Sequence, residues 1–336
     1  MKQRFLGSLM GLGVGDAYGV PFEWKEKFSY MTRDSIDGLW YVIKKPITPP
    51  DDMVASFDAE GNIKTQVGQW SDDLSLALCL AKSLVDCGEH NPRSQMRNYR
   101  DWLIHGILTA TGVAYGSGRT MRTAVEAFEK EEFAYFTGDI EGGKIGNGSV
   151  MRLAPIVMFN YYDKHEAITK AMDTSRVTHS DPVCLDMCAI FAELIWKALR
   201  GYAKEDVLAK SQVLRKYVTS LEGIHFSERD WNKVKAEQPE NNSQIYSNIQ
   251  VEASGYAPKS MEAGIWCFCV TDTFVDGMKL ALSLGGDTDS TCSIFGQLAG
   301  AYYGIDAIPY HWQNALMKNE YVHYYAQKLL TITQTK

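Results

Sequence analysis

The sequence predicts an all-α protein, and three observations support this fold class. Apolar residues recur at helical spacing in several segments of the chain. Strand-like alternation of apolar and polar residues is scarce throughout. The 336 residues are 45% hydrophobic and 22% charged, an ordinary globular composition that is sufficient for a large core in one or two domains.

Four glycines near the N-terminus recur every fourth residue: Gly7, Gly11, Gly15 and Gly19. On a helix this spacing places them along one face, where the missing side chains allow a neighbouring segment to approach closely. We expect such packing at Gly7 and Gly11. The same segment resembles the charged and apolar parts of a signal peptide, but Asp16 follows directly and no cleavage site is evident.

Two segments lack sustained periodicity. Residues 25–70 carry prolines and adjacent aspartates, which indicates an irregular excursion of the kind that often forms a lid or binding loop. Residues from about 227 to 254 are polar and contain a Glu-Asn-Asn-Ser run, which predicts a surface insertion. We expect both to lie within one domain that spans residues 1–336.

Helical spacing of apolar residues is clearest in the segments 74–85, 183–194, 274–284 and 291–303. The second of these has identifiable ends, because Ser180 or Asp181 can cap it, Pro182 lies in its first turn and Gly201 follows it. A shorter run with helical spacing lies at 120–130, between the first and second of these segments.

Charge and cysteine content exclude several functional classes. The net charge is -7 with a pI near 5.6, so no general basic field is present to bind nucleic acid or an anionic membrane. No stretch approaches the roughly 20 apolar residues of a membrane-spanning helix. The seven cysteines form no CxxC pair and lie mostly in apolar runs, as reduced core cysteines do. We therefore expect a cytoplasmic location.

Two acidic clusters with similar chemistry stand far apart in the chain, and each precedes an apolar helix. Their residues are Ser71, Asp72 and Asp73 in the first, and Asp287, Asp289 and Ser290 in the second. Each offers carboxylate and hydroxyl oxygens without imidazole or thiolate, a donor set that suits Mg²⁺ or Mn²⁺ over Zn²⁺. The first cluster is also what a helix N-cap and first turn favour without any metal. The second cluster is preceded by Gly285 and Gly286, which helix capping alone does not require, and this favours a metal site.

If folding brings the clusters together, their four carboxylates repel one another unless protons or cations neutralise them. Two divalent ions balance four negative charges. The glycine-rich segment that ends at Glu23 adds two acids, Asp16 and Glu23, as possible ligands or orienting groups. Its spacing does not match a dinucleotide-binding fingerprint.

Three further motifs carry possible ligand contacts. The Gly116-Ser117-Gly118 turn precedes a helical run and exposes backbone N–H groups that can cradle a phosphate, although a plain turn is the alternative. The segment 146–152 supplies backbone donors at Asn147 and a hydroxyl at Ser149, but Asn-Gly is also an ordinary turn dipeptide. For His179, phosphate contact and a structural role are equal alternatives.

Taken together, these segments resemble the ADP-ribosylglycohydrolase family over nearly the whole chain, from about residue 5 to residue 303. Six motifs carry the resemblance in order: GVGDAYGVPFE, WSDDLSLALCLAKSL, GNGSVMRLAPI, VTHSDP, SGYAPKSMEAGIW and LGGDTDSTCSIFGQLAGAYYG. The resemblance implies a compact all-α, single-domain bundle around a central binuclear Mg²⁺ or Mn²⁺ centre.

The resemblance also implies roles for individual residues. The metal ligands are expected at Ser71, Asp72, Asp73, Asp287, Asp289 and Ser290, with Glu23, Asp72 and Asp289 as catalytic residues. Substrate contacts are expected at Gly116, Ser117, Gly118, Asn147, Ser149, His179, Gly255 and Tyr256. Glu23 matches the acid of the family's mobile flap, and either Glu23 or Asp289 is the candidate general base or acid.

Four residues depart from the commoner family pattern. Serine replaces threonine at Ser71 and Ser290, which retains the ligand oxygen, and Leu74 stands where many members have threonine. Gly116 occupies a position that is aspartate in members acting on ADP-ribosylarginine. Because that aspartate is thought to assist at the guanidinium, Tyr-Gly-Ser-Gly is more similar to members acting on O-linked ADP-ribose.

The expected function is metal-dependent hydrolysis of the bond between the distal ribose of ADP-ribose and an acceptor, an arginine or serine side chain of a modified protein. A small conjugate such as O-acetyl-ADP-ribose, or a modified nucleic acid, is an alternative substrate. A different class of function is an immunity or binding protein that sequesters ADP-ribose or occludes a cognate ADP-ribosyltransferase. The retained acids make a purely structural, crystallin-like role the weakest alternative.

Overall fold

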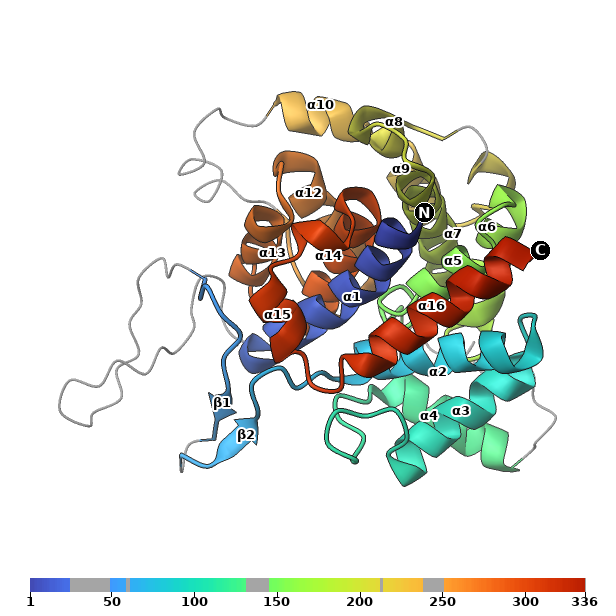
Figure 1. The fold of residues 1–336 in the computed structure, drawn as a ribbon. Coiled ribbons are helices and arrows are strands. Elements are labelled where there is room, and N and C mark those ends of the chain that lie inside the picture. The colour runs from blue at the N-terminus through green and yellow to red at the C-terminus, as the bar shows by residue number, and fades with distance from the viewer. Residues whose placement is uncertain (25–48, 59–60, 131–144, 212–213, 238–250, 336) are drawn as a thin grey trace.

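The computed structural model describes residues 1–24, 49–58, 61–130, 145–211, 214–237 and 251–335. Helices dominate this part of the chain, which confirms the predicted all-α fold class (Figure 1). The only sheet in these ranges is a short antiparallel pair, β1 (Ser56–Phe57) and β2 (Ile63–Thr65), which lies within the predicted excursion. Residues 25–48 of that excursion lie outside the described residues. None of the described helices combines the length and apolar character needed to cross a bilayer.

Two helices from opposite ends of the sequence form the centre of the fold. Helix α1 (Lys2–Gly19) packs along α14 (Thr288–Tyr303), and Figure 1 shows them side by side. A Cβ on Gly11 would lie 2.2 Å from the backbone oxygen of Gly296, and a Cβ on Gly296 would lie 2.0 Å from that of Gly11. The predicted close packing of the glycine face is therefore confirmed, and its partner is a second glycine-lined helix.

This packing has a direct consequence for the acidic residues. At the C-terminal end of α1, a Cβ on Gly19 would meet the backbone of Thr288 and Asp289. The end of the first helix therefore lies against the start of α14, where the second acidic cluster is found. Because glycines have no side chain, two segments about 270 positions apart in sequence can pack with their backbones in direct contact.

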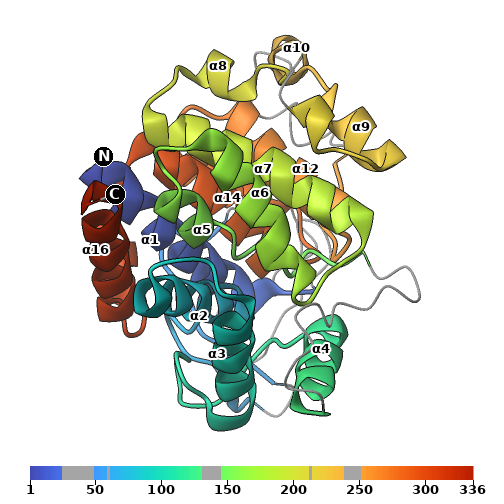
Figure 2. The same ribbon diagram turned by 90° about the vertical axis from the view of Figure 1, so that its right-hand side faces the viewer.

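The remaining helices surround this pair (Figures 1 and 2). One group follows the acidic segment at residue 71: α2 (Asp72–Cys87), α3 (Pro92–His105) and α4 (Arg119–Lys130). A second group covers another side of the core: α5 (Ala154–Phe159), α6 (Lys164–Arg176), α7 (Pro182–Arg200), α12 (Ala257–Val270) and α13 (Phe274–Ser283). The C-terminal α16 (Glu320–Thr335) crosses α1, α2 and α5.

Shorter elements complete the described structure: η1 (Val20–Phe22), α8 (Lys204–Leu208), η2 (Leu214–Lys216), α9 (Leu221–Ser227), α10 (Trp231–Ala236), η3 (Ile305–Ala307) and α15 (Tyr310–Ala315). The polar segment 227–254 thus contains a helix, because Asp230 caps α10 and Trp231, only 4% exposed, anchors it. Residues 238–250 of the predicted insertion lie outside the described residues.

The predicted ends of α7 are confirmed. The Asp181 side chain accepts a hydrogen bond from the Val183 N–H, and Gly201 ends the helix at φ 82°. All seven cysteines are free and six are buried, with Cys87 the exposed one, as expected for reduced core residues. Helix α14 begins at Thr288, three residues earlier than its apolar pattern indicates.

Candidate active site

The first acidic cluster is held at the start of α2 by an acid from α1. Ser71 caps the helix, and its hydroxyl accepts from the Asp73 N–H. The two carboxylate oxygens of Asp16 accept from the backbone N–H groups of Ser71 and Leu74, each at 2.8 Å. Asp16 therefore fixes the start of α2 from outside the helix. This is the orienting role, one of the two alternatives that the sequence offers for Asp16.

The two acidic clusters meet in space. Ser71 Oγ lies 3.3 Å from Asp73 Oδ2 and 3.4 Å from Asp289 Oδ2, although 218 residues separate the first and last of these. Carboxylate oxygens of Asp16, Asp73 and Asp289 lie within 4.8 Å of one another, and so do those of Glu23, Asp287 and Asp289. Asp289 belongs to both groups, so the arrangement is two adjoining carboxylate sites that share one side chain.

This concentration of negative charge is poorly compensated by the protein. Burial, and next the charge of Asp16, raise the pKa values of Asp72 and Asp73 well above their usual range. Burial, and next the charge of Asp287, do the same for Asp289. Burial raises the pKa of Asp16 to about 7 despite its two backbone hydrogen bonds.

No lysine or arginine within the described ranges forms an ion pair with these acids, and Asp73 Oδ1 is buried without a hydrogen-bond partner there. Hard oxygen donors, raised carboxyl pKa values and an orphaned carboxylate oxygen all fit divalent cations such as Mg²⁺ or Mn²⁺. Without such ions, protons must supply the neutralisation. The residues present therefore fit the group that the resemblance implies.

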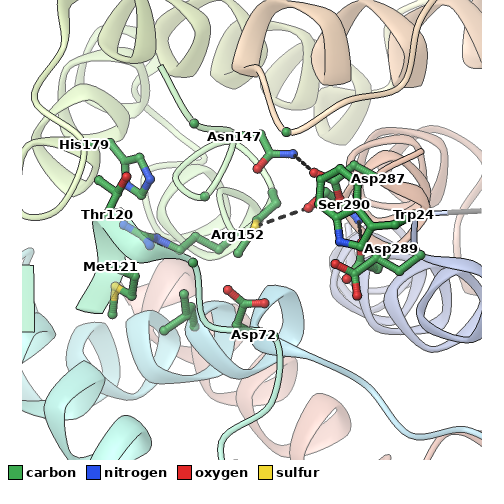
Figure 3. A pocket seen from close by; sticks show the side chains of 18 residues that line it. Trp24, Asp72, Thr120, Met121, Asn147, Arg152, His179, Asp287, Asp289 and Ser290 are labelled. Carbon is green, nitrogen blue, oxygen red and sulfur yellow. Dashed lines mark hydrogen bonds between the residues drawn. The ribbon is translucent and has the colours of Figure 1, made fainter. Parts of the chain in front are cut away.

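A cavity of about 210 Å³ opens over the shared carboxylate (Figure 3). Ten of the residues predicted for the site line it: Glu23, Asp72, Gly116, Gly118, Asn147, His179, Gly255, Asp287, Asp289 and Ser290. Asn147 Nδ2 donates to Asp287 Oδ2 at 3.0 Å and to Ser260 Oγ, which orients the carboxylate. The Asn147 N–H donates to the carbonyl of Gly255, which joins the two predicted substrate loops.

Five predicted residues do not line this cavity. Ser71 and Asp73 lie buried beneath it, beside Asp289. Ser117 and Tyr256 flank lining glycines without lining the cavity themselves.

The fifth residue, Ser149, is 1% exposed, and its hydroxyl accepts from Ser175, whose carbonyl in turn receives the His179 N–H. The side chain of Ser149 thus supports the backbone of His179 from behind. It does not face the cavity as a phosphate contact would.

The cavity also contains residues that sequence reasoning did not assign. Trp24 follows Glu23, is 66% exposed, has φ 59° and donates its N–H to the Gly286 carbonyl. Arg152 is 1% exposed and lies in the cavity wall between His179 and the carboxylates (Figure 3). No spacing or composition signal singles out Trp24.

The two ends of the cavity differ in charge. The end near α14 carries the carboxylates, whereas the other end holds Arg152 and His179. Burial, with a smaller contribution from the Arg152 charge, lowers the pKa of His179 to about 3, so the ring is neutral at physiological pH. The arrangement can hold cations at one end and an anionic or hydroxyl oxygen at the other.

Comparisons with known proteins agree with this geometry. The chain is 27% identical over 327 residues to the ADP-ribosylarginine hydrolase Tri1 of Pseudomonas putida, covering 97% of this chain and 77% of that one. It is 24% identical to the ADP-ribosyl-[dinitrogen reductase] glycohydrolase of Rhodospirillum rubrum, covering 94% and 91% of the two chains. It is also 24% identical to human ADP-ribosylhydrolase ARH3, covering 98% and 94%.

A solved structure described as an ADP-ribosylglycohydrolase-related protein complex has a TM-score of 0.75 and 31% identity, covering 99% of this chain and 98% of that one. The sequence profile of the ADP-ribosylglycohydrolase family matches residues 1–336. The chain therefore belongs to the ADP-ribosylglycohydrolase family and is a hydrolytic enzyme that acts on ADP-ribose conjugates.

Proposed function

We propose that this enzyme hydrolyses the glycosidic bond between the distal ribose of ADP-ribose and an acceptor group, and that it requires two divalent cations, Mg²⁺ or Mn²⁺. One observation carries the metal requirement: two three-carboxylate groups, five of whose six members are buried when the shared Asp289 is counted in each, meet at Asp289, and no lysine or arginine of the described chain forms an ion pair with them. Ser71, Asp72, Asp73, Asp287, Asp289 and Ser290 are the proposed ligands. When bound, the cations would neutralise the acids and supply Lewis-acid activation of a water.

Glu23 is the acid best placed to move a proton during the reaction. It lines the cavity and is only half-buried, whereas Asp289 lies deeper and is shared by both carboxylate groups. Burial, and next the charge of Asp287, raise the pKa of Glu23 above its usual value, which is the direction that suits a carboxyl group acting as a general acid or base. We assign proton transfer to Glu23 and leave metal binding to Asp289.

The remaining wall residues would orient the substrate. Asn147 holds Asp287 by its side chain and Gly255 by its backbone, so it sets the spacing between the carboxylates and the loop at 255. Gly116 lies directly against Asp72, and Gly118 lines the same cavity, so neither position adds a side chain to the wall. Such a surface allows the ligand to approach the backbone closely.

The acceptor linkage is the finer part of the proposal. Two relatives with 27% identity are named as ADP-ribosylarginine hydrolases, which favours an arginine acceptor. One feature favours an O-linked acceptor such as serine instead: a Cβ on Gly116 would lie 2.5 Å from Asp72 Oδ1, and φ is 87° there. The aspartate expected at this position in arginine-linkage members therefore has no room in this backbone.

A panel of defined conjugates tests the proposal: ADP-ribosylarginine peptide, ADP-ribosylserine peptide and O-acetyl-ADP-ribose, each assayed with Mg²⁺, with Mn²⁺ and after EDTA treatment. Release of free ADP-ribose from at least one conjugate, lost in EDTA and restored by metal, is the expected result. Full turnover by metal-stripped protein would refute the metal requirement. Binding of ADP-ribose without hydrolysis of any conjugate would favour the binding-protein alternative.

The same assay separates the proposed roles of the two acids. Glu23→Gln should lower kcat by about 10²–10⁴-fold while metal affinity stays close to that of the wild type. Asp289→Asn should lose both turnover and metal binding. Glu89→Gln, which alters an exposed acid beyond the far end of α2, is the matched control and should keep both. Equal turnover by Glu23→Gln and the control would contradict the assignment.

A further inference from the structure

Three buried side chains form a hydrogen-bonded chain in the cavity wall opposite the carboxylates. Arg152 Nη2 donates to Thr178 Oγ1 at 2.7 Å, and Thr178 Oγ1 lies 2.8 Å from His179 Nδ1. The guanidinium of Arg152 stacks over the ring of Tyr99, 4.7 Å from its centroid, which fixes its orientation. The chain runs from a buried permanent charge to a neutral imidazole ring.

The donors and acceptors of this chain determine the tautomer of His179. A guanidinium can only donate, so Thr178 Oγ1 is an acceptor toward Arg152 and its own hydrogen is free to donate. The nearby acceptor for that hydrogen is His179 Nδ1. His179 Nδ1 is then unprotonated, and in a neutral ring the proton lies on Nε2.

The opposite tautomer is disfavoured by the same contacts. If Nδ1 carried the proton, Thr178 Oγ1 would accept from both neighbours and its hydroxyl hydrogen would need another acceptor. Within the described ranges no other acceptor for Thr178 Oγ1 is found, and the residue is fully buried. A buried hydroxyl hydrogen without an acceptor is unfavourable.

The protonated Nε2 is directed to the part of the cavity that carries no acid. A Cβ on Gly148 would lie 3.0 Å from His179 Nε2, and one on Gly146 would lie 3.5 Å from it, so the ring edge faces two glycines that place no side chain against it. Both glycines line the cavity. Figure 3 shows His179 in the same wall. Next to this donor, Arg152 Nη1 is buried without a hydrogen-bond partner among the described residues, and no carboxylate there forms an ion pair with Arg152.

We propose that Arg152 and Thr178 are positioning residues that fix His179 as an Nε2–H donor, so that this donor, beside the unpaired guanidinium charge, serves the phosphate contact that is already expected at His179. The proposal rests on the proposed function, because the anion is taken to be the diphosphate of ADP-ribose. A donor with a fixed direction and an adjacent buried positive charge suit an anion. Unprotonated Nε2 would instead present a lone pair to the phosphate and repel it.

The tautomer can be measured without any substrate. Long-range ¹H–¹⁵N spectra of histidine-labelled enzyme distinguish protonated from unprotonated ring nitrogens, and His179→Gln assigns the signals among the seven histidines. We expect the wild type and Thr178→Ser to show only Nε2–H at His179, and Thr178→Val, which lacks the hydroxyl, to show a tautomer mixture. A wild-type His179 with Nδ1–H would overturn the proposal, whatever the variants do.

Ligand binding tests the role of the donor. With Mg²⁺ present, Thr178→Val should bind ADP-ribose about tenfold more weakly than Thr178→Ser, the loss expected for one hydrogen bond to a charged group. Its KM for the hydrolysed conjugate should rise while kcat stays the same, because the contact is remote from the reacting bond. Equal affinities of the two variants would overturn the proposal.

The two proposals can fail separately. If wild-type enzyme hydrolyses no ADP-ribose conjugate yet shows the expected tautomer and variant affinities, the proposed function fails and the positioning role stands. If conjugates are hydrolysed and the tautomer is reversed, the positioning role fails alone.

Discussion

Removal of divalent metal should make the stability of this protein strongly dependent on pH. Burial raises the pKa of Asp16 from 3.8 to about 7, and the pKa values of Asp72, Asp73 and Asp289 are raised as well. For a carboxyl group whose folded-state pKa is raised, the folded protein binds more protons than the unfolded chain. The stability that this protonation provides is complete below about pH 4 and is lost as the pH rises toward 7.

The size of the effect follows from Asp16 alone. A rise in pKa from 3.8 to about 7 corresponds to roughly 4 kcal/mol of unfolding free energy lost across this interval, as an upper figure. For 336 residues, an unfolding entropy of about 2 cal/mol/K per residue converts this loss to a fall in Tm of about 6 °C. The other raised carboxyl pKa values act in the same direction.

Bound cations should reverse this loss, because they replace the protons as neutralising charges and bind only the folded site. The assay is thermal melting between pH 5 and pH 8, in EDTA and in millimolar Mg²⁺ or Mn²⁺. We expect the metal-dependent rise in Tm to be small at pH 5 and largest at pH 8. A metal effect that is absent, or that is equal at both pH values, would refute the reasoning.

Three further outcomes are expected. Asp73→Asn, which removes an acid with an orphaned oxygen, should raise the Tm of the metal-free protein at pH 8 and abolish the Mn²⁺-dependent rise; a lower metal-free Tm would contradict this. Gly116→Ala, whose Cβ would lie 2.5 Å from Asp72 Oδ1, should weaken Mn²⁺ binding in calorimetry by at least about tenfold. The control Gly118→Ala, whose Cβ meets nothing within 4 Å, should bind Mn²⁺ as the wild type does. Equal affinities of the two variants would argue against a metal-ligand role for Asp72. Gly296→Ala, whose Cβ would lie 2.0 Å from a backbone oxygen of α1, should lower the unfolding free energy by about 1–3 kcal/mol or more in denaturant melts. An unchanged unfolding midpoint would contradict the contact between α1 and α14.

Local signals in the sequence predicted much of the helical structure. The ends of α7 could be read from Asp181 and Gly201 because capping depends on adjacent residues. The apolar pattern predicts the start of α14 three residues too late, since the first turn of this helix is made of the acidic residues that precede the pattern. Apolar periodicity shows where a helix is buried and does not show where its first turn begins.

The acidic residues of the site were identifiable from their chemistry, but their meeting in space depended on tertiary packing. The glycine spacing predicted a close approach to α1 without identifying α14 as the partner. The role of Asp16 was open, because the backbone N–H groups that it binds lie 55 and 58 residues away. Ser149 was expected at the ligand, yet its hydroxyl is taken up by Ser175 behind the cavity wall.

The central claim is that two divalent cations occupy adjoining sites joined by Asp289. The most direct test is a crystal structure of the Mn²⁺-soaked enzyme with anomalous diffraction measured at the manganese edge. We expect two anomalous peaks in the cavity, one near Asp73 and one near Glu23 or Asp287, each within bonding distance of an Asp289 oxygen. A single peak, or peaks only outside this cavity, would contradict it.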